Sequence, residues 1–199
     1  MKKLLITAAL AVAMASLLAA CGGSDNEGEH TIAATGNPTD RAFVVGMIPH
    51  HEAAIDMAKV AQDRGQSQFV TSLADDIVRT QGEEILTMRD IDAELAAGGV
   101  KAGDLGLSES AMGMEGDMST LEHAKSFDPM FMQMMVPHHQ GAIRMARVEI
   151  QRGMDPRLKE LAQEIIDAQS REIAEMNAQL GGSGMHDSGG MGSMDGMSQ

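Results

Sequence analysis

The chain has 199 residues, of which 19 are methionine and only four are aromatic, all of them phenylalanine. The formal net charge is −14 at pH 7, which disfavours binding to nucleic acid or to anionic lipid headgroups. Cys21 is the only cysteine, so the sequence predicts neither a disulfide framework nor a zinc site of paired cysteines.

The first 20 residues are typical of a signal peptide that ends in a lipoprotein cleavage site. Lys2 and Lys3 precede an apolar run, and Leu18-Ala19-Ala20-Cys21 stands in the position of a lipobox. The run is too short for a membrane-spanning helix. We therefore expect lipidation of Cys21 and a mature protein anchored to the membrane of the cell envelope on its extracytoplasmic side. An ordinary secretory signal is the alternative.

Composition divides the rest of the chain into two regular blocks and three Gly-rich segments. Residues 21–39 are predicted to form a flexible tether, residues 98–127 a Gly- and Met-rich linker, and residues 181–199 a disordered tail. The blocks at 40–97 and 128–180 keep a helical spacing of apolar residues.

Each block is predicted to be a helical hairpin, because capping residues flank two apolar periodic stretches. Only two or three residues separate these stretches, so the two helices of a block must be antiparallel. The predicted N-caps, C-caps and helix starts are Asp40, Asp128, Pro129, Gly65, Gly153, Ser67 and Asp155-Pro156.

The two blocks are copies of one unit, since matching residues recur 88 positions apart. Two copies of an antiparallel hairpin predict an all-α fold, a ferritin-like four-helix bundle with a pseudo-two-fold axis. The matches include Phe43 with Phe131, Arg64-Gly65 with Arg152-Gly153, Leu73-Ala74 with Leu161-Ala162, Ile77 with Ile165, Gln81 with Gln169, and Met88 with Met176.

The most specific motif is Met-x-Pro-His-His, which occurs at 47–51 and again at 135–139. Because a helix advances about 100° per residue, both histidines and the flanking methionines of each copy share one helix face. Imidazole and thioether ligands together favour copper, especially Cu(I), although other transition metals remain possible. Two such clusters favour a metal site over ordinary core packing. The candidate ligands are Met47, His50, His51, Met57, Met135, His138, His139 and Met145.

A proline lies directly before each histidine pair, at Pro49 and Pro137. If the helices start at the predicted caps, these prolines are internal and bend the helix. The alternative is that each helix begins at its proline.

Polar residues interrupt the apolar stripe of the second helix in each block. Antiparallel pairing places Gln81 opposite His50 and Glu84 opposite Met47, and the second block repeats this arrangement. A buried carboxylate costs several kcal/mol unless it is paired or bound to a cation. Possible additional ligands or supporting groups are therefore Gln81, Glu84, Met88, Met132, Met134, Gln169, Glu172 and Met176.

The linker and the tail carry further methionines and histidines. Their spacing suggests arms that capture Cu(I) loosely and pass it to the bundle. The alternative is a solvated low-complexity sequence without a ligand role. These residues are Met112, Met114, Met118, His123, Met185, His186, Met191, Met194 and Met197.

The pattern Phe-x3-Met-x-Pro-His-His-x2-Ala-Ile-x-Met-Ala, which occurs at 43–58 and again at 131–146, resembles a bacterial family, domain of unknown function 305. The resemblance implies a ferritin-like four-helix fold. In CopM-type members it implies a periplasmic or secreted protein that binds copper and supports copper resistance, with the eight candidate ligands above as metal-binding residues. Val44 stands where the second copy has Met132, which leaves open a difference in affinity between the two halves.

Three functions follow from these patterns. The favoured one is a non-enzymatic protein that binds Cu(I) and possibly Cu(II) for sequestration, trafficking or resistance, with a copper-relay protein as a possible partner. The second is a ferritin-like metallo-oxidase that uses Glu84 and Glu172, although the Glu-x-x-His signature of di-iron bundles is missing. The third is a helical interaction module. The sequence leaves open the oligomeric state and whether the two clusters form one site or two.

Overall fold

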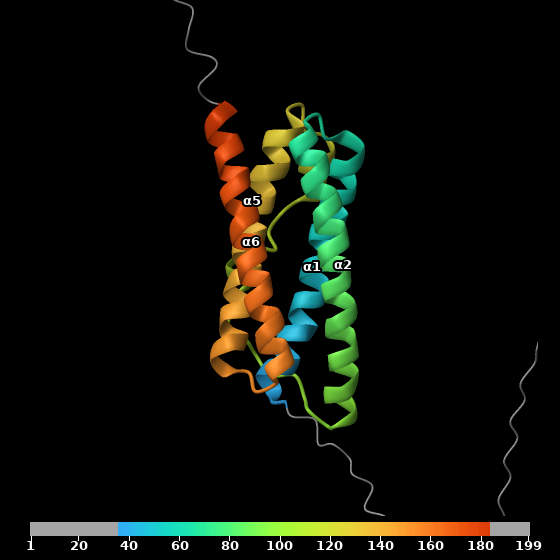
Figure 1. Ribbon diagram of the computed structural model, residues 1–199, viewed down its shortest axis with the longest axis vertical. Coiled ribbons are helices and arrows are strands. Elements are labelled where there is room, and N and C mark those ends of the chain that lie inside the picture. Colours follow the sequence, from blue (N-terminus) through green and yellow to red (C-terminus); the bar gives the residue numbers. More distant parts are fainter. Residues whose placement is uncertain (1–35, 184–199) are drawn as a thin grey trace, which may run out of the picture. The chain divides into compact units, whose positions relative to one another are not determined.

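The computed structural model describes residues 36–183, and every regular element in that part of the chain is a helix (Figure 1). The all-α prediction is therefore confirmed. None of these helices is long and apolar enough to cross a membrane. The helices are α1 (Pro38–Arg64), α2 (Gln68–Ala97), α3 (Glu109–Met112), α4 (Met118–Glu122), α5 (Phe127–Arg152) and α6 (Pro156–Ser183).

The four long helices form two hairpins, as predicted. Helix α1 packs along α2 and helix α5 along α6, and the two pairs meet where α1 lies against α5 (Figure 1). Helices α2 and α6 touch each other only sparsely, so the fourth side of the bundle is less tightly closed. Helix α6 continues to Ser183, past the boundary predicted at residue 180.

Helix α1 begins earlier than predicted, because Asn37 and not Asp40 is its N-cap. The Asn37 side chain accepts hydrogen bonds from the backbone N–H groups of Thr39 and Asp40. The Asp40 carboxylate in turn accepts from the backbone N–H of Asn37 at 2.5 Å. This reciprocal pair is a capping box, so Asp40 lies inside the first turn.

Helix α5 also starts ahead of its predicted N-cap. Its N-cap is Ser126 and its first residue is Phe127, so Asp128 and Pro129 both lie inside the first turn. Proline is tolerated there because the N–H groups of the first turn have no partner within the helix. The predicted positions of Asp128 and Pro129 are therefore wrong by two residues.

The other predicted helix ends are confirmed. Gly65 and Gly153 are the C-caps of α1 and α5, and each donates its backbone N–H to a carbonyl of the last turn. The Ser67 side chain caps α2 by accepting from the N–H of Val70, and α6 starts at Pro156.

Asp40 and Asp128 instead connect each repeat to the turn of the other. Asp40 in α1 accepts hydrogen bonds at 2.8–3.0 Å from the backbone N–H groups of residues 154–155, in the turn between α5 and α6. Asp128 in α5 accepts at 2.8 Å from the N–H groups of residues 66–67, in the turn between α1 and α2. These reciprocal bonds tie the start of each hairpin to the turn of the other hairpin.

The linker of residues 98–127 is held against the bundle by two arginines that occupy equivalent places in the repeat. Arg64 donates to the carbonyl groups of three residues within 121–124. Arg152 donates to the carbonyl groups of residues 104–105. The helices α3 and α4 therefore have fixed positions beside α5, with which both are in contact.

Two apolar clusters fill the interior, and a polar layer separates them along the long helices. The first cluster joins the start of α1 to the second half of α2, and the second cluster joins the second half of α1 to the start of α5. Pro49 and Pro137 lie inside α1 and α5, so the alternative that each helix begins at its proline is wrong. The size of the bend stays a prediction. The buried polar residues between the clusters are His50, His51, His138, His139, Gln81 and Gln169.

Candidate metal centre

The four histidines of the two motifs lie in one layer at the interface of α1 and α5. The ring centroids of His50 and His138 are 3.8 Å apart. His51 and His139 flank this central pair, with centroid distances of 6.3 and 6.4 Å to their sequence neighbours. All four side chains are buried. The structure therefore brings the two sequence motifs together into one shared layer.

Carboxylates from the outer helices engage the two flanking histidines. The Nε2 atom of His51 lies 2.8 Å from Oε2 of Glu84, and Nε2 of His139 lies 2.6 Å from Oε2 of Glu172. A carboxylate accepts a hydrogen bond, so these contacts fix the proton of each ring on Nε2 and leave the lone pair on Nδ1. Such carboxylate–histidine pairs orient metal-binding imidazoles in many proteins.

The backbone of α3 holds a third histidine in the same way. The His50 Nε2 atom lies 2.8 Å from the carbonyl oxygen of Met112, to which it donates its proton. The lone pair of this ring is therefore also on Nδ1. His138 has no hydrogen-bond partner at either ring nitrogen.

All four Nδ1 atoms are buried and without a hydrogen-bond partner. A buried polar atom left unpartnered is costly, and most such atoms in folded proteins are satisfied. Neutral imidazole nitrogen is also the form that binds transition metals. The four unpartnered nitrogens therefore fit metal ions as their missing partners.

The central histidines are strongly biased towards the neutral form. Burial, followed by the charges of the neighbouring histidines, lowers the pKa of His138 from 6.5 to about 2. Burial and then the charge of His51 lower the pKa of His50 to about 3. Both rings are thus neutral at pH 7, and their lone pairs are available without displacement of a proton.

The candidate methionines bracket the histidine layer from both sides. Each apolar cluster contains three sulfurs that come from three different helices and occupy equivalent places in the repeat. Met132 adds a fourth to the second cluster, and Met134 is partly buried beside it. The first cluster holds Met47, Met88 and Met145, and the second holds Met57, Met135 and Met176.

Nitrogen and oxygen ligands alone do not complete a site. Among residues 36–183, no three His, Cys, Asp or Glu side chains are grouped so as to hold one ion. The carboxylates of Glu84 and Glu172 are occupied by the histidines. A metal in the layer therefore needs thioether sulfur, or the amide oxygens of Gln81 and Gln169, which are buried and unpartnered.

The predicted register of the outer helices was partly wrong. Glu84 pairs with His51, and not with the position of Met47 as simple antiparallel counting predicted. Glu172 likewise pairs with His139. Each carboxylate retains 17% side-chain exposure, so it lies at the edge of the polar layer and is not fully buried.

The contribution of α3 was missed at the sequence level. Met112 was considered only for its sulfur, whereas its backbone carbonyl oxygen accepts the hydrogen bond from His50. Gly141 permits this approach, because a Cβ atom at residue 141 would lie 1.7 Å from the Met112 carbonyl oxygen. Arg144 adds a hydrogen bond to the carbonyl of Ala111. A glycine inside the second motif, where the first has Ala53, was the available signal.

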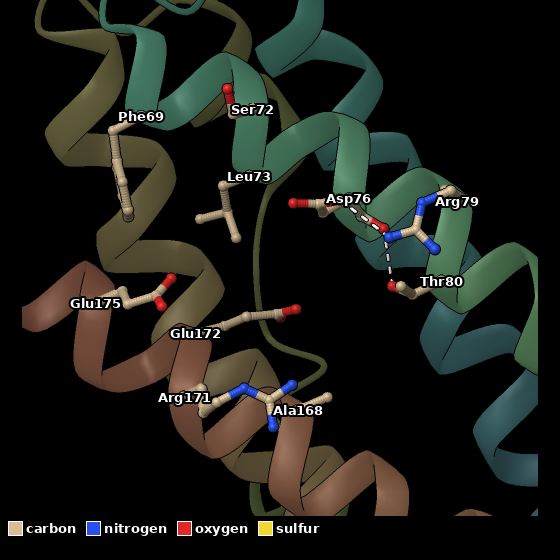
Figure 2. A pocket seen from close by; sticks show the side chains of 10 residues that line it. All are labelled: Phe69, Ser72, Leu73, Asp76, Arg79, Thr80, Ala168, Arg171, Glu172 and Glu175. Atoms are coloured by element: carbon tan, nitrogen blue, oxygen red, sulfur yellow. Dashed lines mark hydrogen bonds and ion pairs between the residues drawn. The ribbon is translucent and has the colours of Figure 1, made fainter.

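A groove between α2 and α6 is lined by side chains of both helices (Figure 2). Its volume is about 330 Å³, and Glu172, the partner of His139, is part of its wall. Asp76 and Glu175 line the same groove. Glu172 therefore contributes both to the wall of this groove and to the hydrogen bond that orients His139.

Several sequence predictions lie outside the described residues. The signal peptide of residues 1–20 and the lipidation site Cys21 are among them. So are the tail residues Met185, His186, Met191, Met194 and Met197.

The domain of unknown function 305 (DUF305) matches residues 10–92 and again residues 97–180. The chain belongs to the DUF305 family. Two successive DUF305 matches agree with the internal repeat found in the sequence.

Solved DUF305-type structures share the fold. CopM in its Cu(II)-bound form is 31% identical, with a TM-score of 0.63 over 72% of this chain and 97% of CopM. CopM in its Cu(I)-bound form is 30% identical, with a TM-score of 0.61 and coverage of 72% and 96%. A DUF305 protein from Streptomyces coelicolor, predicted to be secreted, is 27% identical, with a TM-score of 0.63 and coverage of 73% and 94%.

A viral protein is similar to part of this chain. An uncharacterized protein of Acanthamoeba polyphaga mimivirus is 45% identical over 53 residues, which are 27% of this chain. The matched segment spans only 35% of the viral protein.

Proposed function

We propose that this protein binds copper at the layer formed by His50, His51, His138 and His139. The observation that carries the proposal is the set of four buried Nδ1 atoms without a hydrogen-bond partner. Three of these rings are fixed through Nε2 by Glu84, Glu172 or the Met112 carbonyl. Their Nδ1 lone pairs are therefore prepared for a metal before any metal arrives.

The chemistry of the surrounding side chains favours copper over harder metals. The ligand set consists of neutral imidazoles bracketed by thioethers, and soft ligands of this kind select Cu(I) while imidazole also suits Cu(II). In this proposal Met47, Met57, Met135 and Met145 complete the coordination in the reduced state. CopM, which shares the fold at about 30% identity, has been crystallised with Cu(I), Cu(II) and silver.

The cellular role we propose is sequestration, trafficking or resistance at the cell envelope. The predicted lipobox supports an extracytoplasmic location of the mature protein, with Cys21 as the lipid anchor. A methionine site suits that compartment, because cysteine ligands would be lost to disulfides there. A copper-relay protein is the partner that trafficking would require.

The carboxylates argue against the metallo-oxidase alternative. In a di-iron bundle the glutamates bind the metal ions directly. Here Glu84 and Glu172 each accept a hydrogen bond from a histidine, which assigns them to orientation of the rings. A plain interaction module would leave the four unpartnered nitrogens without a function. We therefore propose a binding protein and not an enzyme.

The test is a titration of the purified protein with Cu(I) under a competing chelator, next to Cu(II), Zn(II) and Fe(II). We expect His50→Ala/His138→Ala to weaken copper binding by more than about 100-fold, because loss of supporting groups alone costs about 10- to 100-fold. His123→Ala is the comparison variant, since His123 is exposed, its ring bonds the Ser119 carbonyl, and loose capture by the linker would add little to the affinity of the layer. Equal affinity in both variants would contradict the proposal.

A further inference from the structure

A second, smaller pocket opens onto the histidine layer from the linker side. Its volume is about 150 Å³, and its wall contains three methionines, Met57, Met114 and Met118, together with His138. Met114 is 38% exposed at the surface, whereas Met57 is buried. The pocket therefore leads from solvent to a buried imidazole, and thioether sulfur atoms line its wall.

The position related to this pocket by the internal repeat is closed. Gly141 and Arg144 of α5 correspond to Ala53 and Asp56 of α1, 88 residues earlier. The backbone of α3 rests on Gly141 and accepts a hydrogen bond from Arg144 at the Ala111 carbonyl. On the other half, Ala53 and Asp56 line the open pocket. One side of the symmetric layer is thus covered by backbone and the other is open.

The hydrogen bonding of the two central histidines differs in the same way, between the closed side and the open side. His50, on the closed side, has its Nε2 occupied by the Met112 carbonyl. His138, on the open side, is 4% exposed and has no partner at Nδ1 or at Nε2. One nitrogen of His138 can therefore serve the layer while the other serves the pocket.

The lining of this pocket selects for a particular class of ligand. Thioether sulfur is uncharged and soft, and with imidazole it binds Cu(I) or Ag(I) in preference to Zn(II) or Mg(II). Asp56, on the pocket wall, is 65% exposed and pairs with Lys59 at 3.3 Å, so its carboxylate lies at the solvent side of the pocket. The pocket offers three sulfurs and one nitrogen.

We propose that Met57, Met114, Met118 and His138 form an outer binding site for a soft monovalent cation, through which that cation reaches the histidine layer, and that the two sites share Met57 and His138. The proposal rests on the proposed copper function for the identity of its cargo. It adds that entry is one-sided, because α3 closes the equivalent position, and that the linker between the repeats supplies two of the ligands.

The experiment compares the full-length purified protein with Met114→Leu/Met118→Leu. Leucine keeps the volume and apolar character of methionine but removes the sulfur. The control is Met154→Leu, since Met154 is 66% exposed in the α5–α6 turn, away from the pocket. Silver(I) is the equilibrium probe, and the uptake rate is followed with Cu(I) delivered from a coloured chelate. Circular dichroism establishes that each variant is folded.

We expect the double variant to bind one silver ion fewer and to take up Cu(I) about tenfold more slowly, because the activation barrier for uptake is higher without the two sulfurs. Met154→Leu should match the wild type in both measurements. Equal silver counts and equal uptake rates in the double variant and the control would overturn the outer site. Loss of one silver ion in a protein whose histidines take up no copper would retain the outer site and overturn the proposed copper function instead.

Discussion

The rings of His50 and His138 lie 3.8 Å apart, centroid to centroid, although 88 residues separate them in the chain. This contact joins two sequence motifs into one polar layer. Because the two residues occupy equivalent positions in the repeat, the contact lies on or near the pseudo-two-fold axis of the bundle. Because the two halves of the layer are related by the repeat, the effect of a substitution in one half can be compared with the effect of the equivalent substitution in the other.

Replacement of Glu172 should weaken copper binding without removal of a ligand. In Glu172→Gln the orienting carboxylate of His139 is lost, and supporting groups of this kind are worth about 10- to 100-fold in metal affinity. Glu175→Gln is the matched control, because Glu175 lines the same groove (Figure 2) but has no such contact with His139. Competition titrations with Cu(I) measure both. A larger loss in Glu175→Gln would contradict the orienting role.

Gly141→Ala should destabilise the protein, although alanine normally favours a helix over glycine by about 0.5–1 kcal/mol. The added Cβ would lie 1.7 Å from the Met112 carbonyl oxygen, so α3 must move away. We expect a loss of about 1–3 kcal/mol, the range for overpacking. In Gly82→Ala the new Cβ meets nothing within 4 Å, so that variant should gain stability. Urea unfolding of both variants tests the close approach of α3.

Asp40→Asn should cost more stability than Asp128→Asn. Asp40 is fully buried and accepts four hydrogen bonds, three of them from residues 154–155, whereas the bonds of Asp128 to residues 66–67 are exposed. Hydrogen bonds to a charged group contribute about 1.5–3 kcal/mol, and burial removes the compensation by water. Chemical denaturation of the two variants gives the comparison. Equal losses of unfolding free energy in the two variants would contradict the expected effect of burial at Asp40.

The metal-free protein should be most stable near pH 6.5. Because the pKa values of His50 and His138 are lowered in the folded state, the unfolded chain binds protons at these residues at a higher pH than the folded chain does. The contribution of the two neutral histidines to stability is therefore complete above pH 6.5 and is lost as the pH falls. Burial, and then the Asp40 carboxylate, raise the pKa of Glu149 from 4.5 to about 8. Its contribution is complete below pH 4.5 and is lost as the pH rises towards 8.

The variant Glu149→Gln separates these two effects. It should remove the loss on the alkaline side, which amounts to about 1.4 kcal/mol per pH unit for one proton, and steepen the rise between pH 4.5 and 6.5 by a similar amount. Urea unfolding between pH 4.5 and 8 measures both limbs. Persistence of the alkaline loss in Glu149→Gln would assign it to another group.

Much of the fold could be predicted from the sequence, because local signals determine it. The apolar spacing, Gly65, Gly153 and Ser67 indicated the hairpins, and the repeat indicated how they pair. The histidine motifs were also local. The N-caps were misassigned because Asn37 competes with Asp40 within one turn, and only the tertiary contact of Asp40 with residues 154–155 explains its position.

The linker could not be placed from the sequence, because its position depends on contacts between distant residues. A short helix such as α3 has no strong periodic signal, and it is fixed by Gly141, Arg144 and His50. The pairing of Glu84 with His51 depends on the relative shift of α1 and α2, which counting from the turn did not give correctly.

The most direct test of the shared histidine layer is X-ray absorption at the copper edge of the Cu(I)-loaded protein and of His50→Ala/His138→Ala. We expect nitrogen and sulfur neighbours around copper in the wild type, and a smaller nitrogen contribution in the double variant, in which only His51 and His139 remain. An unchanged coordination shell in the double variant would place the copper elsewhere and contradict the account.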